Sequence, residues 1–504
     1  MTSTLRFEGK NIPVFQQETV GAALRRSGVP LAMECGGKNR CGRCRIVFTS
    51  GIFLIDGKIV DVPAAGPVTA NACTVRMLSS RGSAEFPAGK ASASPHEDPG
   101  IVLPAGIRSA FSGTAVALDI GTTNVAAVLL EGGRIVRTAE RTNAQIRCGD
   151  NVIDRIAFAA RPGGADELKR ALIDETVIPL IHALTAAPEK IAQTAVAANS
   201  VMTHFFFGVD ASSLGQAPYR PVKMHFSGTS KSCGLTGLPA ETPVFGADLI
   251  GGFIGGDISA GLTVSGFGSK EARELYMDIG TNCEIVLNDR GSFTALSAAA
   301  GPAFERLGLR SDHRGNIRHV RFRGGKWIFE PDIAEPAGFC GTGLVDLLAE
   351  SGRNHFTDDF GKRQNDPRLP GNLALSDAQT AELVTAKAAV ESALGVLFRQ
   401  TGVSPGDIEK VYLAGNFSEH LDIVNGIYTG LLPDIPPERF VKPGNASLAG
   451  AAAMLIDPEI RGRTAEWRKV TKHVNPAEDP HYPEIFASAM RIKRGDFSTW
   501  SNRN

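Results

Sequence analysis

The sequence predicts a multidomain protein of mixed α+β and α/β class, with a small β-rich N-terminal domain, a linker and a larger two-lobed α/β part. Three observations carry this prediction: four cysteines near the start, a stretch rich in Pro, Ala and Ser after them, and a strand–turn–strand pattern that occurs twice later. A chain of 504 residues is also long enough for two or more domains. The expected divisions are 1–86 for the N-terminal domain, 87–113 for a flexible linker, 114–270 and 271–456 for the two lobes, and 457–504 for a C-terminal extension.

The first feature is a cysteine frame of the form C-x5-C-x2-C with a distant fourth cysteine. Its members are Cys35, Cys41, Cys44 and Cys73. The spacing is close to the plant-type C-x4-C-x2-C frame that holds a [2Fe–2S] cluster. Glycines among the ligands let backbone N–H groups approach the cluster sulfurs. A structural zinc site is the alternative, but zinc sites usually have paired C-x2-C knuckles, and the outer cysteines here are single.

The residues around the cysteines fit a small β-grasp domain. Residues 5–7 and 12–15 alternate like two strands of a hairpin, residues 20–27 are helix-like, and residues 45–48 resemble a strand. The cysteine loop is also basic, which fits either a solvated rim or a docking site for an acidic redox partner, and both interpretations stay open.

Composition excludes several classes of function. The 53 basic and 53 acidic residues give no net charge, so the sequence predicts neither a nucleic-acid partner nor a membrane surface. No apolar run is long enough to span a membrane, and the chain is expected in a reducing cytoplasm. His204 is expected to pack in a core. Four further cysteines are scattered and are expected to be small buried residues: Cys148, Cys233, Cys283 and Cys340.

The internal repeat is an apolar strand that ends in Asp-Ile-Gly-Thr and is followed by a second apolar strand. Two copies at a domain-sized interval predict two similar lobes that face each other across a cleft. A glycine turn offers backbone N–H groups to phosphate, and a strand-end aspartate can hold Mg²⁺ through water. The expected site residues are Asp119, Gly121, Thr122, Thr123 and Asn124 in the first copy, and Asp278, Gly280, Thr281 and Asn282 in the second.

Two more glycine turns complete the predicted nucleotide site. One is Gly341-Thr342-Gly343, which leads into a helix over 344–350, and the other is Gly415-Asn416, which ends a strand over 410–414. Glycine there would let an adenosine ring lie against the backbone. Asp257 is expected either to orient the attacking water or to be a helix N-cap, and Glu284 either to lie near the phosphates or to pair with a neighbour. No G-x-x-x-x-G-K-[ST] motif is present, so the pattern is not that of a P-loop ATPase.

Together these motifs resemble the acetate and sugar kinase, Hsp70 and actin superfamily, whose lobes have an RNase H-like fold. The whole chain resembles, more closely, the ferredoxin-fused reductive activators of corrinoid-dependent methyltransferases. This resemblance runs from about residue 5 to about residue 456. Five further stretches carry it: residues 251–257, residues 300–305, Ala386-Lys387, residues 430–433 and Gly444-Asn445.

The resemblance implies an ATP-hydrolysing activator that uses Mg²⁺ and passes one electron from a [2Fe–2S] cluster to a corrinoid protein, reducing cob(II)alamin to cob(I)alamin. An external reductase, ferredoxin or flavodoxin would supply the electron. Cys283 departs from the family pattern, since relatives often have glycine there. No cysteine follows Cys340, so the N-terminal cluster would carry the electron alone.

Other functions stay open at this point. The chain is alternatively an ATP-dependent activator of a radical dehydratase-type enzyme, a small-molecule kinase with a redox sensor, or an Hsp70-like binding module. The methyl donor, the electron donor and the assembly state, including a homodimer, are left open.

Overall fold

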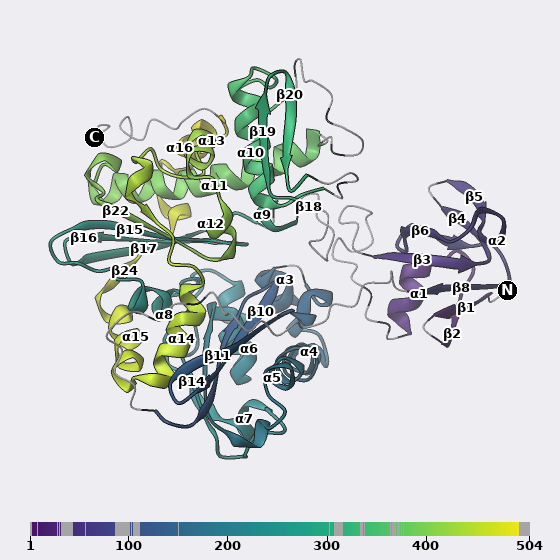
Figure 1. Ribbon diagram of the computed structural model, residues 1–504, viewed down its shortest axis with the longest axis horizontal. Coiled ribbons are helices and arrows are strands. Elements are labelled where there is room, and N and C mark those ends of the chain that lie inside the picture. Colours follow the sequence, from purple (N-terminus) through teal and green to yellow (C-terminus); the bar gives the residue numbers. More distant parts are fainter. Residues whose placement is uncertain are drawn as a thin grey trace. The chain divides into compact units, whose positions relative to one another are not determined.

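The computed structural model divides the chain into two compact units, the first formed mainly by Met1–Ser92 and the second by most of the remaining chain (Figure 1). Cys35, Cys41 and nearly all of the predicted linker lie outside the described residues. The structure describes residues 3–7, 9–27, 29, 31, 44–55, 57–85, 101, 103, 111–149, 151–301, 303–306, 316–332, 336, 338–362, 364, 369, 373, 375 and 377–492.

The first unit is a small β-rich domain, as predicted. Its main sheet has the strand order β2-β1-β8-β3-β6, with β1 parallel to β8, and a second sheet has the order β5-β4-β7. The helix α1 (Val20–Arg26) begins after Thr19, whose hydroxyl accepts from the Ala22 N–H at 3.3 Å. The strands are β1 (Ser3–Phe7), β2 (Lys10–Val14), β3 (Arg45–Ser50), β4 (Ile52–Ile55), β5 (Lys58–Asp61), β6 (Val68–Asn71), β7 (Arg76–Met77) and β8 (Arg81–Glu85), with the short helix α2 (Val62–Ala65).

The first lobe of the second unit is built on a six-stranded sheet of order β11-β10-β9-β12-β14-β13. Its strands are β9 (Thr114–Ile120), β10 (Asn124–Glu131), β11 (Arg134–Thr142), β12 (Ile191–Ala198), β13 (Ser227–Thr229) and β14 (Pro243–Gly246). Its helices are α3 (Val152–Ala159), α4 (Gly164–Leu172), α5 (Ile178–Leu184), α6 (Ser200–Phe207), α7 (Ser230–Cys233) and α8 (Gly256–Val264).

The second lobe repeats this plan with the strand order β23-β22-β15-β16-β17-β24. Its strands are β15 (Arg273–Ile279), β16 (Cys283–Asp289), β17 (Ser292–Ala298), β22 (Lys410–Ala414), β23 (Phe440–Val441) and β24 (Thr471–His473). Its principal helices are α10 (Gly341–Arg353), α11 (Asp377–Thr401), α12 (Asn416–His420), α13 (Ile423–Thr429) and α16 (Tyr482–Ala489), with the short α9 (Ala303–Arg306).

The two lobes share one topology. β9 is antiparallel to β10 and parallel to β12, and β15 is antiparallel to β16 and parallel to β22. The repeated strand–turn–strand pattern therefore marks two copies of one structural unit. The prediction of a two-lobed actin-like and Hsp70-like fold is confirmed.

The C-terminal part of the chain does not follow the expected division at residue 456. The helix α14 (Ala446–Ile456) packs on β9, β12 and α8 of the first lobe, although its sequence follows the second lobe (Figure 1). An added Cβ on Gly450 would overlap the backbone of Ala260, so the helices α8 and α14 meet at backbone contact. The expected separate extension is instead shared: α15 (Pro458–Val470) packs on α8 and α14, β24 joins β17, and α16 packs on α11.

Among the described helices, none has the length and apolar character that crossing a membrane requires.

Candidate nucleotide site and cysteine site

The turn that joins β9 to β10 is held in place from three sides. The Asn143 side chain donates to the carbonyl of Gly121 at 2.9 Å, and the buried Arg155 donates to the carbonyl of Thr122 at 2.6 Å. Asn199, the N-cap of α6, donates to the Thr122 hydroxyl at 3.1 Å. A turn fixed in this way leaves its backbone N–H groups preorganised for an anion.

The equivalent turn in the second lobe joins β15 to β16. Here the N–H of Gly280 donates to the carbonyl of Asn282 at 2.8 Å, which closes the turn on Thr281. Both predicted phosphate turns are therefore strand–turn–strand connections at the same end of homologous strands.

Four carboxylates gather where these strands end. Asp119 and Asp278 are the next-to-last residues of β9 and β15, and Glu284 on β16 is the cross-strand neighbour of Asp278. Asp257 lies in the first turn of α8, and its carboxylate accepts from the Ile258 N–H at 2.9 Å. Gly255 is the N-cap of that helix, so the interpretation of Asp257 as an N-cap is wrong.

The electrostatics of this group are unusual because the carboxylates are close together and poorly solvated. Burial, followed by the charges of Asp278 and Asp119, raises the pKa of Asp257 to about 8. Burial, followed by the charges of Asp257 and Asp278, raises the pKa of Glu284 well above its usual range, although the Ser297 hydroxyl donates to it at 3.1 Å. Such strongly perturbed carboxyls in one place are typical of functional sites.

Asp119 is positioned by the start of α14. Asn445 donates to one carboxylate oxygen at 3.0 Å and Ser447 donates to the other at 2.9 Å. Asn445 also caps the helix, because its side-chain oxygen accepts from the Leu448 N–H at 2.9 Å. Burial raises the pKa of Asp119, and these two donors act in the opposite direction. Sequence analysis gave Asn445 no specific role and missed Ser447, Asn199 and Ser297.

The glycine that ends β22 contacts the acidic group directly. Gly415 has a φ of +87°, and a Cβ at this position would lie 2.5 Å from a carboxylate oxygen of Asp278. The next residue, Asn416, begins α12, but its side chain lies outside the described part of the chain. The predicted adenosine turn is thus adjacent to the second predicted phosphate strand.

The remaining glycine turn lies at the start of α10, which begins at Gly341 rather than at 344 as expected. An added Cβ on Gly341 would overlap the carbonyl of Phe304 and lie 3.0 Å from the ring of Phe417. The Thr342 hydroxyl donates to the carbonyl of Arg318 at 2.8 Å. Small residues are therefore needed here for close packing, and Phe417 links this turn to the Gly415 turn.

A Gly415→Ala substitution is expected to weaken Mg-nucleotide binding about tenfold or more, because the new methyl group displaces the Asp278 carboxylate and the positive φ adds about 1 kcal/mol of strain. Isothermal titration with Mg-ADP measures this. Gly402→Ala is the matched control, because Gly402 also has a positive φ, +71°, and an added Cβ there would have no atom within 4 Å. Equal affinities of the two variants would contradict the role of the contact with Asp278.

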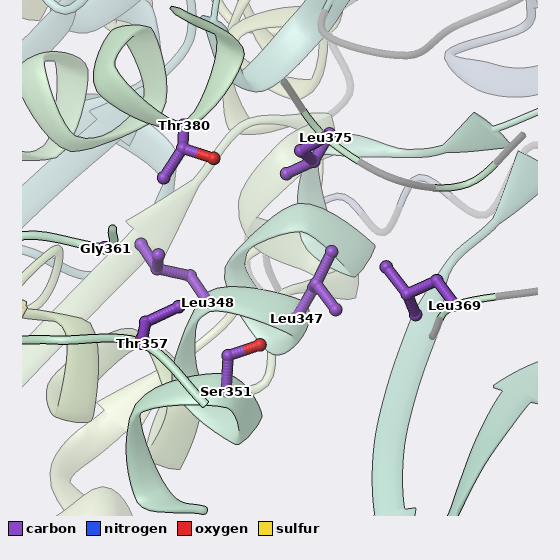
Figure 2. A pocket seen from close by; sticks show the side chains of 8 residues that line it. All are labelled: Leu347, Leu348, Ser351, Thr357, Gly361, Leu369, Leu375 and Thr380. Carbon is purple, nitrogen blue, oxygen red and sulfur yellow. The ribbon is translucent and has the colours of Figure 1, made fainter. Parts of the chain in front are cut away.

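The second lobe also contains a small cavity that is distinct from this group of carboxylates (Figure 2). Its volume is about 20 Å³, which is room for about one water molecule. Leu347, Leu348 and Ser351 of α10 face Thr380 of α11 across it, and the buried hydroxyl of Thr357 has no hydrogen-bond partner in the described structure. The cavity is too small to hold a nucleotide.

In the first unit, the structure brings together the two described members of the cysteine frame. Cys44 directly precedes β3 and Cys73 follows β6, and these strands pair with Arg45 opposite Asn71. The Ala72 N–H donates to the carbonyl of Cys44 at 2.8 Å. Both cysteine side chains are buried, with exposures of 1% and 6%. Two thiols at adjacent strand ends fit half of a cluster-binding site, and Cys35 and Cys41 lie outside the described residues.

Other residues that the sequence raised have structural roles. His204 is buried, its Nδ1–H donates to the carbonyl of Ser200 at 2.6 Å and its ring packs edge-on against Phe226, so the prediction of a core histidine is confirmed. Cys148, Cys233 and Cys283 are buried as expected. Cys340, the N-cap residue of α10, is only partly buried, so the expectation of full burial is wrong for this cysteine.

Comparisons with known proteins agree with this geometry. The family described as "RACo middle region" matches residues 114–270, and the one described as "C-terminal domain of RACo the ASKHA domain" matches residues 272–371 and 364–504. The chain is similar to the corrinoid activation enzyme RamQ of Eubacterium limosum, with 28% identity over 411 residues that cover 74% of this chain and 69% of that protein.

A second relative is the Co(II) methylated amine-specific corrinoid protein reductase of Methanosarcina barkeri. It is 24% identical over 391 residues, which cover 68% of this chain and 70% of that protein. A solved structure named reductive activator for corrinoid, iron-sulfur protein has a TM-score of 0.69 at 22% identity and covers 98% of this chain and 99% of its own. That structure supports the fold of the chain.

Proposed function

This chain belongs to the family of reductive activators of corrinoid proteins, and from that premise we propose that it couples ATP binding and hydrolysis to the one-electron reduction of a corrinoid protein from cob(II)alamin to cob(I)alamin. The observation that carries the proposal is the joint presence of two features: four carboxylates, Glu284 buried and the three aspartates half-buried, beside the two predicted phosphate turns, and a pair of buried cysteines in a separate β-rich unit.

ATP and Mg²⁺ are the proposed ligands of the second unit. The turns at Gly121 and Gly280 would hold the phosphates through backbone N–H groups. Four carboxylates in a buried place repel one another, and a hard divalent cation held through its waters would relieve that repulsion. Asp119, fixed by Asn445 and Ser447, and Asp278, held against Gly415, are the proposed carboxylates for Mg²⁺.

Asp257 is the proposed group that orients the attacking water. It differs from Asp119 because, among the described residues, no side chain donates to it, and backbone N–H groups such as that of Ile258 do so instead. An oxygen that is left available can accept a proton from water as the γ-phosphate is attacked. Glu284, which the Ser297 hydroxyl holds, is proposed to tune that proton affinity through its charge.

Cys35, Cys41, Cys44 and Cys73 are the proposed ligands of a [2Fe–2S] cluster, with Cys44 and Cys73 brought together as described above. When bound, the cluster would store the single electron that is then given to Co(II). One electron enters from an external reductase, ferredoxin or flavodoxin and one leaves to cobalt, so the exchange is balanced. The cytoplasm is the proposed compartment, and a homodimer is one open assembly.

An anaerobic optical assay tests the proposal. The purified chain, a chemical reductant and the cognate corrinoid protein in its Co(II) state are mixed with and without Mg-ATP, and the cob(II)alamin and cob(I)alamin bands are followed. The expected result is formation of cob(I)alamin only with Mg-ATP, and its loss in Cys44→Ala. Cys233→Ala, which changes an equally buried cysteine of the second unit, is the control and is expected to stay active. Reduction at the same rate without nucleotide would refute the coupling.

A further inference from the structure

A hairpin on the second lobe forms a basic pocket that the nucleotide site does not use. The strands β19 (His319–Arg323) and β20 (Lys326–Glu330) form a two-stranded sheet of their own beside α10 (Figure 1). Between this hairpin, α10 and α13 lies a hollow of about 370 Å³. Three arginines line it, Arg321, Arg323 and Arg353.

The hairpin is held rigidly on its inner side. Phe322 packs against Trp327 at 5.0 Å and against Phe356 at 4.8 Å between ring centroids. Two buried carboxylates of α10 bond the backbone of β19: Asp346 accepts from the Val320 N–H at 3.2 Å and Glu350 accepts from the Phe322 N–H at 3.0 Å. The pocket is therefore a fixed feature of the lobe.

Two of the three arginines are already engaged within the protein. Arg323 and Arg353 pair with Glu350 at 3.3 and 3.2 Å, and Arg353 also donates to Asn425 at 2.5 Å. Arg321 makes no ion pair within the described part of the chain and is exposed. It lies directly across the hairpin from Ile328, which is 52% exposed, and Val424 on the opposite wall is 55% exposed.

The basic character extends beyond the pocket. Arg318, Lys442 and His319 lie near enough to His420 for their charges, after burial, to lower its pKa, and the charge of Glu419 acts in the opposite direction. Lys326 adds a further exposed cation at the hairpin end. The acidic residues that line the pocket are Asp422 and Glu350, and Glu350 is already paired. The three arginines therefore leave an excess of positive charge there. A surface with an unengaged arginine beside exposed aliphatic side chains suits an acidic partner that also presents an apolar group.

We propose that this pocket binds an acidic, partly apolar loop of the corrinoid protein. The choice of this partner rests on the proposed function. The chain's own residues 493–504 do not suit it, because they carry Lys493, Arg494 and Arg503 against the single Asp496. The choice of the corrinoid protein over the electron donor rests on α10. This helix of 13 residues begins at the Gly341 turn beside Phe417 and ends at the pocket with Glu350 and Arg353, so one rigid element about 20 Å long joins the nucleotide end to the docking end.

An Arg321→Glu variant tests the docking site. The Kd of the full chain for the corrinoid protein in its Co(II) state is measured anaerobically by biolayer interferometry at low and high salt, with Mg-ATP present. We expect binding to weaken about tenfold at low salt, as for one interface hot spot. Arg321→Lys is expected to keep the affinity, and ATP hydrolysis without partner is expected to be unchanged in both variants.

Lys326→Glu is the matched control, because it reverses an exposed charge on the same hairpin outside the pocket lining. Weakening by Arg321→Glu alone would support the pocket as the docking site. Equal weakening by both variants would overturn it in favour of general electrostatic attraction, and unchanged binding in Arg321→Glu would overturn it outright. If the unaltered chain reduces the corrinoid protein with Mg-ATP but the Arg321→Glu variant still binds that protein normally, only this docking inference fails. If the unaltered chain does not reduce the corrinoid protein at all, the proposed function itself fails.

Discussion

Asp257→Asn is expected to lower the rate of ATP hydrolysis about a hundredfold or more, while Mg-nucleotide still binds. A positioned acid or base contributes roughly 10²–10⁴ to a reaction rate, and the amide that replaces Asp257 cannot accept a proton from water. This change leaves the two proposed phosphate turns and the hydrogen bond from Asn445 to Asp119 untouched. Steady-state phosphate release and Mg-ADP titration measure the two quantities separately.

Asp166→Asn is the matched control, because Asp166 also lies in the first turn of a first-lobe helix, α4, but is exposed. It is expected to hydrolyse ATP at the unaltered rate. A loss of nucleotide affinity in Asp257→Asn as large as the loss of rate would contradict a role in orienting water, and would place Asp257 among the binding groups instead.

The titration of Asp257 should also make both the stability of the protein and the proton release on nucleotide binding depend on pH. Burial and the charges of Asp278 and Asp119 raise the pKa of Asp257 from 3.8 to about 8. The folded, ligand-free protein therefore holds this proton between pH 4 and 8, where the unfolded chain has lost it. The stabilising contribution is complete below the pKa of the unfolded chain and disappears as the pH rises to about 8.

Mg²⁺ favours the ionised form of Asp257, so nucleotide binding should release protons near pH 7, and the Asp257→Asn variant should release about one proton fewer. Titration in buffers of different ionisation enthalpy counts them.

The parts of this site that follow from local sequence could be predicted. A strand that ends in Asp-Ile-Gly-Thr specifies its own turn, so both strand–turn–strand connections and their strand-end aspartates could be located from the sequence. Two copies of this pattern at a domain-sized interval also indicated the two similar lobes. The cysteine frame could be identified from the spacing of its residues alone.

The rest depends on contacts between distant parts of the chain. Asn445 and Asp119 are 326 residues apart, and nothing local in either segment indicates the other. The helix α14 is buried along its whole length, so its sequence has no polar face to show which lobe it covers. Tertiary contacts place it on the first lobe, among them the packing of Gly450 against Ala260 and the packing of α14 on β9 and β12. The raised pKa values of Asp119, Asp257 and Glu284 likewise arise from tertiary proximity and not from any single motif.

Lys387→Met is expected to destabilise the second lobe by about 3–5 kcal/mol, because it leaves a buried carboxylate without its partner. Lys387 and Glu391 lie one turn apart on α11, with exposures of 1% and 5%, and their charged atoms are 2.6 Å apart. Lys387 also donates to the carbonyl of Arg491, which follows α16. Burial raises the pKa of Glu391 to about 7, and burial lowers the pKa of Lys387.

The stretches Ala386-Lys387 and 430–433, which carry part of the family resemblance, meet at this pair. A Cβ on Gly430 would lie 2.5 Å from the Glu391 carboxylate, so the glycine leaves room for the ion pair. These residues lie on α11 and at the end of α13, and none of them contacts the four carboxylates in any described interaction. Their role is therefore to fasten the C-terminal segment to α11.

Hydrogen exchange of the α11 backbone amides measures the local effect, and protection is expected to fall about 10²–10⁴-fold in Lys387→Met. The double variant Lys387→Met/Glu391→Leu is expected to recover most of that protection, because replacing both charges by apolar groups removes the desolvation penalty. The double variant should not recover the exchange protection of α16. In both variants the carbonyl of Arg491, which follows this helix, has lost the hydrogen bond from the Lys387 ammonium group. If the double variant is as unprotected along α11 as the single one, the loss arises from packing and not from the unpaired carboxylate.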